Sequence, residues 1–234
     1  MPSGYAFENI SDNSLEISHP ETIKTFNFHS KGNYISVVFK KPKNSPAVCI
    51  HNIKKQQTQV PFKKLKGIVI NALFHPIKPI FFVISETLIK SFHLSNLENL
   101  VKIEIPSTKA VSSSLHKSGN HLIIGCDNGK VMWFDLELTI KPLRILNCHS
   151  EIVTDVKFHS TSDLFCSASE DGSTVVYDGK VFSDLMKNPE IMPIKKISAH
   201  SKTTNEPGVT CVTFTSKLNN IISGGHDKLI RLFA

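Results

Sequence analysis

The sequence predicts an all-β fold built from a repeated unit of about 40 to 45 residues. An apolar or β-branched segment ending in Phe-His recurs as TFNFH, NALFH and DVKFH, and SSSLH and CVTFT are weaker copies. The last residues of the five copies, in chain order, are His29, His75, His116, His159 and Thr215, separated by 46, 41, 43 and 56 residues. Since one four-stranded blade of a β-propeller has this length, about five blades are legible.

In the third, fourth and fifth repeats, the segment after the anchor has the pattern of a blade hairpin. Asn128-Gly129 and Asp171-Gly172 suit tight turns that need positive φ, and short alternating strands flank them. An aromatic residue stands 18 positions after three of the anchors, at Phe134, Tyr177 and Phe233, and an Asp follows the first two. This is the position of the Trp-Asp pair of WD repeats, so the fold class is a WD-repeat β-propeller.

The repeats also set the expected domain organisation. Residues 23–234 are expected to form the propeller, with an insertion at 179–208 before the last repeat. The final repeat ends at Ala234 after its third strand, which would expose a sheet edge and leave the ring incomplete. Residues 1–22 are therefore expected to supply a closing strand, with Ser14 to Ser18 as the candidate.

Composition favours a globular binding protein. Forty per cent of the residues are hydrophobic, and the net charge of +7 favours polyanionic partners such as nucleic acid. The five cysteines include no Cys-x-x-Cys pair, so neither a disulfide framework nor a zinc motif is expected. No apolar run approaches the 18 residues of a membrane span, and the N-terminus has no signal-peptide pattern, so a soluble, unsecreted protein without a membrane partner is expected.

A buried hydrogen-bond network is expected in the fourth repeat. WD repeats share a network among a histidine, a strand serine, a turn aspartate and the aromatic residue. Here the residues that match are His149, Ser169, Asp171 and Tyr177. Such a network would fix the blade, because buried polar groups must be hydrogen-bonded.

The insertion carries a more specific resemblance. The stretches GKVFSDLMKNPEIMPIKKISAH, NEPGVTCVTF and GGHDKLIRLFA resemble the C-terminal propeller of the block-of-proliferation family, the scaffold of eukaryotic ribosome biogenesis that works with Pescadillo. The resemblance implies a non-enzymatic role in large-subunit pre-rRNA processing and assembly in the nucleolus of the nucleus. The implied partners are a second WD-repeat protein of the Pescadillo complex, the pre-60S particle and pre-rRNA.

The chain departs from this family in two respects. The family propeller has seven blades and follows a long N-terminal region that engages Pescadillo, whereas five blades and no such region are legible here. Direct Pescadillo binding is therefore not carried over. The alternative function is that of a general WD-repeat adaptor, such as a ubiquitin-ligase substrate receptor, because one fold hosts many functions.

Two candidate binding surfaces follow. A lysine cluster could contact RNA phosphates, although a solvated loop face is the simpler interpretation: Lys54, Lys55, Lys63, Lys64 and Lys66. In the insertion, Phe182, Leu185 and Met186 share one face of a short helical pattern. That face is expected either to pack on the propeller or to dock a partner.

Catalytic, cofactor and metal sites are not expected. The four anchor histidines each occupy the same place in their own repeat, so a ring of blades would keep them apart, whereas a tetrahedral metal site needs convergent ligands. GCDNGK (Gly125 to Lys130) lacks the spacing and the Ser or Thr of a phosphate-binding loop. Without a constellation of nucleophile, base and acid, the chain is expected not to be an enzyme.

Overall fold

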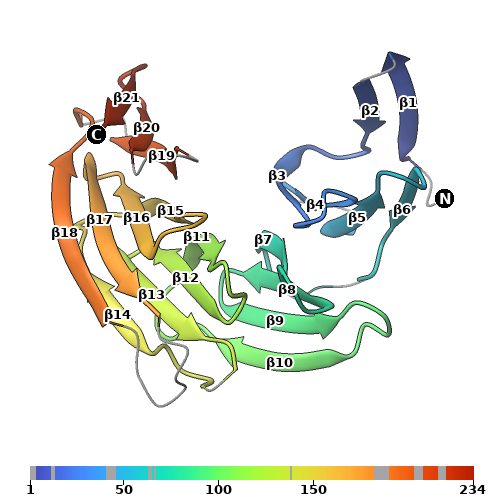
Figure 1. Ribbon diagram of the computed structural model, residues 1–234, viewed down its shortest axis with the longest axis horizontal. Coiled ribbons are helices and arrows are strands. Elements are labelled where there is room, and N and C mark those ends of the chain that lie inside the picture. Colours follow the sequence, from blue (N-terminus) through green and yellow to red (C-terminus); the bar gives the residue numbers. More distant parts are fainter. Residues whose placement is uncertain are drawn as a thin grey trace. The chain divides into compact units, whose positions relative to one another are not determined.

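The computed structural model describes residues 4–11, 14–40, 46–62, 65, 67–137, 139–181, 190–202, 208–215 and 220–234. The chain divides into two compact units, Met1–Ile103 and Glu104–Ala234. Every regular element in the described ranges is a β-strand, which agrees with the predicted all-β class (Figure 1). None of the described residues belongs to a helix long and apolar enough to span a bilayer.

The first unit contains a hairpin and two four-stranded antiparallel sheets. The hairpin pairs β1 (Ala6–Ser11) with β2 (Ser14–Ser18). The first sheet has the order β3-β4-β5-β6, from Ile23–Phe28, Tyr34–Phe39, Val48–Asn52 and Gln57–Gln59. The second has the order β7-β8-β9-β10, from Val69–Phe74, Ile80–Ser85, Leu88–His93 and Asn99–Glu104.

The second unit contains three further sheets in the same up-and-down order. One comprises β11 (Ala110–Leu115), β12 (His121–Cys126), β13 (Lys130–Asp135) and β14 (Arg144–Asn147). The next comprises β15 (Val153–Phe158), β16 (Leu164–Ser169), β17 (Ser173–Lys180) and β18 (Glu190–Ser198). The described strands of the last are β19 (Val209–Phe214), β20 (Ile221–Gly225) and β21 (Ile230–Phe233).

The five sheets are equivalent blades, as their local irregularities show. The first strand of each sheet has a bulge at its start, and the skipped residues are Lys24, Ile70, Val111, Thr154 and Thr210. These positions are separated by the same intervals as the Phe-His anchors. Since a bulge bends its strand and increases the local twist, the same device shapes the inner edge of every blade. The predicted repeat and its five-blade count are confirmed.

The anchor histidines close the turn between the first two strands of their blades. His29, His75, His116 and His159 each donate a backbone N–H to the carbonyl five residues later. In each of them the Nδ1 atom also accepts the backbone N–H of the residue two positions on, at 3.0 to 3.2 Å. The Phe-His motif is thus a turn cap, because the imidazole satisfies a backbone donor that no strand can reach.

Apolar side chains fill the space between neighbouring blades within each unit. In the first unit, Val38 and Val48 of one blade pack with Phe74 and Phe81 of the next. In the second unit, Trp133 and Phe165 lie in one core shared by two blades, with ring centroids 5.4 Å apart. The alternation of the sequence places these residues inside, since period-two side chains face one side of a strand.

Two predicted segments have an unexpected form. Ser14–Ser18 pairs with Ala6–Ser11, so the N-terminal segment is a two-stranded hairpin rather than a single strand. Its pairing with the last blade stays a prediction. The insertion extends a blade hairpin: β17 and β18 continue their ladder as far as Lys180 opposite Glu190. Phe182, Leu185 and Met186 lie outside the described residues.

Candidate functional site

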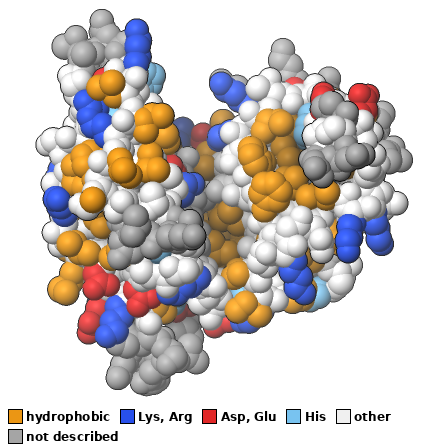
Figure 2. Space-filling view, turned by 45° about the horizontal axis from the view of Figure 1, so that its top comes forward, with side chains coloured by type: hydrophobic (Ala, Val, Ile, Leu, Met, Phe, Trp, Pro, Cys, Tyr) orange, Lys and Arg blue, Asp and Glu red, His pale blue; other side chains and the backbone are white. Residues whose placement is uncertain are grey.

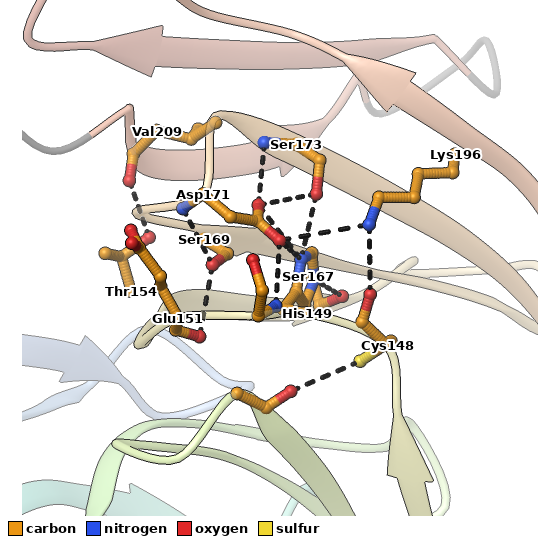
Figure 3. Close-up of polar contacts among 12 residues, drawn as sticks. Cys148, His149, Glu151, Thr154, Ser167, Ser169, Asp171, Ser173, Lys196 and Val209 are labelled. Carbon is orange, nitrogen blue, oxygen red and sulfur yellow. Dashed lines mark hydrogen bonds and ion pairs between the residues drawn. The ribbon is translucent and has the colours of Figure 1, made fainter. Parts of the chain in front are cut away.

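A buried network of hydrogen bonds joins the loop before β15 to the β16–β17 turn. His149 Nδ1 lies 3.2 Å from Asp171 Oδ2, and His149 Nε2 lies 2.7 Å from Ser167 Oγ (Figure 3). The Asp171 carboxylate also accepts the backbone N–H groups of Ser150, at 3.1 Å, and Ser173, at 2.9 Å. The carboxylate therefore ties the loop before β15 to the start of β17, and His149 links both to β16 through Ser167.

The two charged members of the network stabilise each other. Burial is the largest single influence and acts against the ionised form of both side chains, but the hydrogen bond between them and the further hydrogen bonds around them together outweigh it. These hydrogen bonds hold the pKa of Asp171 well below its usual range and raise the pKa of His149. An imidazolium and a carboxylate in contact favour their charged forms, which explains both directions.

Ser169 and Tyr177 do not take the predicted places in this network. Ser169 Oγ instead accepts the N–H of Asp171, at 3.1 Å, and donates to the carbonyl of Glu151, at 3.2 Å. Ser169 ends its strand, whereas Ser167 stands two residues earlier on the same face, level with His149 Nε2. The Tyr177 ring stacks on Phe165 with centroids 4.5 Å apart, and its hydroxyl is buried. The stacked core packing holds Tyr177, and its hydroxyl lies close to Ser167 and Cys148.

The fifth blade contains a second network that the sequence interpretation missed. His200 Nδ1 lies 2.7 Å from Asp227 Oδ1, and His200 Nε2 lies 2.8 Å from Ser223 Oγ. Arg231 donates to Asp227 Oδ2 at 2.5 Å. The available signal was the spacing, because each serine stands four residues before its aspartate, as Ser167 stands before Asp171.

Both networks have the residue types of a catalytic Ser-His-Asp triad, but their surroundings give them another role. Ser167 and Ser223 are 0% exposed. A nucleophilic hydroxyl must reach the substrate carbonyl, whereas these two hydroxyls are buried within their blades and a substrate cannot reach them. The networks consequently act as internal ties that set the geometry of the loops on one face of their blades.

A pocket lies beside the first network in the second unit. Its volume is about 510 Å³, and Lys196 at its rim donates to the carbonyl of Cys148, at 3.3 Å (Figure 3). The Lys196 ammonium is also 3.9 Å from Asp171 Oδ2. The pocket combines apolar walls with two lysines and is lined by Ile145, Leu146, Asn147, Cys148, Val175, Tyr177, Pro193, Ile194, Lys195 and Lys196.

Part of the predicted lysine cluster lies on a surface turn. Lys54 and Lys55 are exposed in the β5–β6 turn, whereas Lys63, Lys64 and Lys66 fall outside the described residues. On the face shown in Figure 2, lysine and arginine side chains occur singly or in small groups. Phe62 is buried and lies 4.4 Å from Phe92 between ring centroids, so it anchors the loop and is not available to stack on a base.

Comparison with known proteins agrees with this geometry. The family described as "WD domain, G-beta repeat" matches residues 140–178 and 192–233, which correspond to the fourth and fifth blades. "Ribosome biogenesis protein bop1" of Danio rerio is 37% identical over 220 residues, which are 94% of this chain and 28% of the relative.

Two further relatives have similar sequence identity and coverage. "Ribosome biogenesis protein erb1" of Neurospora crassa is 38% identical over 94% of this chain and 28% of its own length. "Ribosome biogenesis protein bop1-A" of Xenopus laevis is 39% identical over 94% of this chain and 30% of its own length. The chain thus spans less than a third of the relatives it matches. The similarity and the blade structure together identify this chain as a WD-repeat propeller of the Bop1/Erb1 family of ribosome biogenesis proteins.

Proposed function

We propose that the chain is a non-enzymatic scaffold in ribosome biogenesis, acting in maturation of the large subunit in the nucleolus. The observation that carries this proposal is the 37–39% identity over 94% of the chain to proteins named for ribosome biogenesis. The blade structure supports a scaffold, because its Ser-His-Asp networks are sealed and act as ties. Its partners would be the pre-60S particle and a second WD-repeat protein.

Co-sedimentation tests the scaffold proposal. The epitope-tagged chain is expressed in cells, lysates are separated on a density gradient, and each fraction is probed for the tag and for large-subunit precursor RNA. The tag is expected to follow the pre-60S peak. A tag found solely in the light fractions, or mainly with cullin adaptors in a pull-down, would contradict the proposal and favour the ubiquitin-ligase alternative.

Contact with pre-rRNA is a separable part of the proposal. Lys54 and Lys55 are exposed on one turn and could neutralise two phosphates. Replacing both with Glu should lower the slope of log affinity against log salt by roughly 1.4 to 1.8, which is the loss of two counterion-release contacts. Exchanging the exposed Lys31 and Lys141 for Glu makes the same charge change elsewhere. Equal slopes for the two double variants would argue against a site at the β5–β6 turn.

A further inference from the structure

Three potential metal ligands converge in the first unit. His19 lies between β2 and β3, and Cys49 and His51 lie on the same face of β5. His51 Nε2 is 2.9 Å from His19 Nε2 and 3.2 Å from Cys49 Sγ. The three ligand atoms lie within 4.8 Å of one another. Two imidazole nitrogens and one sulfur thus converge in the fold, although His19 lies 30 positions before Cys49 in the chain.

Hydrogen bonding alone does not account for this convergence. An imidazole nitrogen in the neutral ring has either one proton or one in-plane lone pair. His51 Nε2 can therefore make one well-directed hydrogen bond, yet both the His19 nitrogen and the Cys49 sulfur approach it. A cation between the three atoms would accept one lone pair from each of them at once.

The distances suit a tetrahedral zinc ion after a small adjustment. With Zn–N bonds of about 2.0 to 2.1 Å and Zn–S bonds of about 2.3 Å, tetrahedral angles place two nitrogens roughly 3.4 Å apart and nitrogen and sulfur roughly 3.6 Å apart. The structure has 2.9 Å and 3.2 Å for these pairs. Rotation of the side chains by a few tenths of an ångström at their tips would open the site, and water would fill the fourth position.

Outer partners orient the two imidazoles. His51 Nδ1 is 2.9 Å from Thr58 Oγ1, so donation to this hydroxyl leaves the Nε2 lone pair facing the cluster. His19 has a hydrogen bond to the backbone of Ile17. Metal-ligating histidines usually have such a partner on the other ring nitrogen, because it fixes the tautomer and the ring direction.

An aromatic shell encloses the cluster. The Tyr5 ring lies edge-on to His19 and His51, with centroids 6.0 and 5.9 Å apart, and Phe39 lies 5.7 Å from His19. The Tyr5 hydroxyl is buried beside the Cys49 sulfur, with which it has a hydrogen-bonding interaction. A thiolate at Cys49 would be a stronger acceptor for this hydroxyl than the thiol is.

Protonation states in the enclosed cluster are compatible with metal binding. Burial lowers the pKa of His51 to about 4, and it also lowers the pKa of His19. Burial thus favours the neutral form of both imidazoles, which is the form that binds a metal. Burial raises the pKa of the Cys49 thiol to about 12, so a metal would displace this proton and release it to solvent.

We propose that His19, Cys49 and His51 form a three-ligand zinc site with water as the fourth ligand. Imidazole and thiolate are the ligands that Zn²⁺ prefers. Because one ligand follows the N-terminal hairpin and the other two belong to β5, the ion would fasten the hairpin segment to the first blade.

Cobalt substitution tests the site directly. The metal-free chain is titrated with Co²⁺ and followed by absorption spectroscopy, and zinc affinity is then measured by displacing the cobalt. The expected result is one equivalent of Co²⁺ with tetrahedral d–d bands and a thiolate-to-metal charge-transfer band. Free zinc at roughly 100 times its Kd should raise the Tm by about 5 to 10 °C in a chain of this size.

Three variants locate the ligands. Cys49→Ser should remove the charge-transfer band and weaken zinc binding by more than about 100-fold, since loss of a ligand exceeds the loss of an outer partner. Thr58→Val should keep the band and weaken binding by about 10- to 100-fold. Cys211→Ser removes an exposed thiol and should change nothing.

Either of two results would overturn the proposal. The first is a wild-type cobalt complex without a thiolate charge-transfer band, which needs no variant to fold. The second is zinc affinity that is equal in wild type and Cys49→Ser, whatever the affinity of Cys211→Ser.

Discussion

Replacement of Asp171 by Ala should destabilise the second unit more than any exposed charge substitution. The carboxylate accepts hydrogen bonds from His149, from the Ser173 hydroxyl at 2.6 Å and from the backbone N–H groups of Ser150 and Ser173. Its side chain is 8% exposed, and that of His149 is 0% exposed. Ala would therefore leave four donors without their acceptor in a site that water hardly reaches.

The magnitude follows from this count. Removal of one partner of a buried ion pair costs about 3 to 5 kcal/mol, because the other charge is left uncompensated. Asp171→Asn keeps the size and one acceptor oxygen, so its cost should be about 1.5 to 3 kcal/mol, that of a charged hydrogen bond. Asp163 supplies the matched control. Its bond to Lys117 is 3.1 Å long, but both side chains are about 40% exposed, so Asp163→Ala should cost less than about 1 kcal/mol.

Urea unfolding followed by tryptophan fluorescence measures these differences. Trp133 is the only tryptophan of the chain, is 0% exposed and lies in the same apolar core as Val175 and Tyr177 of the fourth blade. Its emission therefore reports unfolding of the second unit. An Asp171→Ala variant whose unfolding free energy is within about 1 kcal/mol of the wild type, or equal to that of Asp163→Ala, would refute the role given to the network.

Three further predictions concern the same unit and its turns. Gly172 has φ +82°, and a Cβ there would lie 2.5 Å from the His200 carbonyl oxygen, whereas Gly32 has φ +70° and open space around it. Gly172→Ala should therefore lower the free energy of unfolding by clearly more than the about 1 to 2 kcal/mol expected for Gly32→Ala. The unfolding midpoints of the two variants test this difference. The folded pKa of His149 is raised, so its contribution is complete below the unfolded value of about 6.5 and is lost as pH rises through the folded value. The stability gap between wild type and His149→Gln should thus shrink from about pH 6 to pH 9, and a gap that widens would contradict the assignment. Arg231→Gln should lower the unfolding midpoint through loss of its bond to Asp227, but by less than Asp171→Ala does, because the arginine side chain is 35% exposed. The tryptophan assay again measures the difference.

The blades could be predicted because their signals are local. The Phe-His anchor caps a turn, and Asn-Gly and Asp-Gly form hairpin turns. Because these short motifs recur at regular spacing, the sequence alone indicates where the repeats lie. Gly129 and Gly172 do adopt positive φ, at 77° and 82°. The N-terminal hairpin was not predicted because Ala6 to Ser11 was not recognised as a strand, although the sequence Ser-Asp-Asn-Ser at residues 11 to 14 has the residue types of a turn.

The polar sites could be predicted only in part, since strand periodicity leaves two serines on one face. Ser167 and Ser169 are both compatible with the pattern, and only the depth of each along β16 shows which one meets His149. In the first unit, His19 belongs to no repeat position, so the repeat pattern gives no signal for it. The pair Cys49 and His51 was the available signal, because alternate residues of a strand share a face.

The scaffold role in ribosome biogenesis is tested most directly by the identity of what the chain binds. The tagged chain is purified from cells under mild salt, and the co-purified proteins and RNA are identified by mass spectrometry and sequencing. Large-subunit assembly factors, including a second WD-repeat protein, together with large-subunit precursor RNA are the expected result. A purification that contains ubiquitin-ligase subunits and neither assembly factors nor precursor RNA would contradict it.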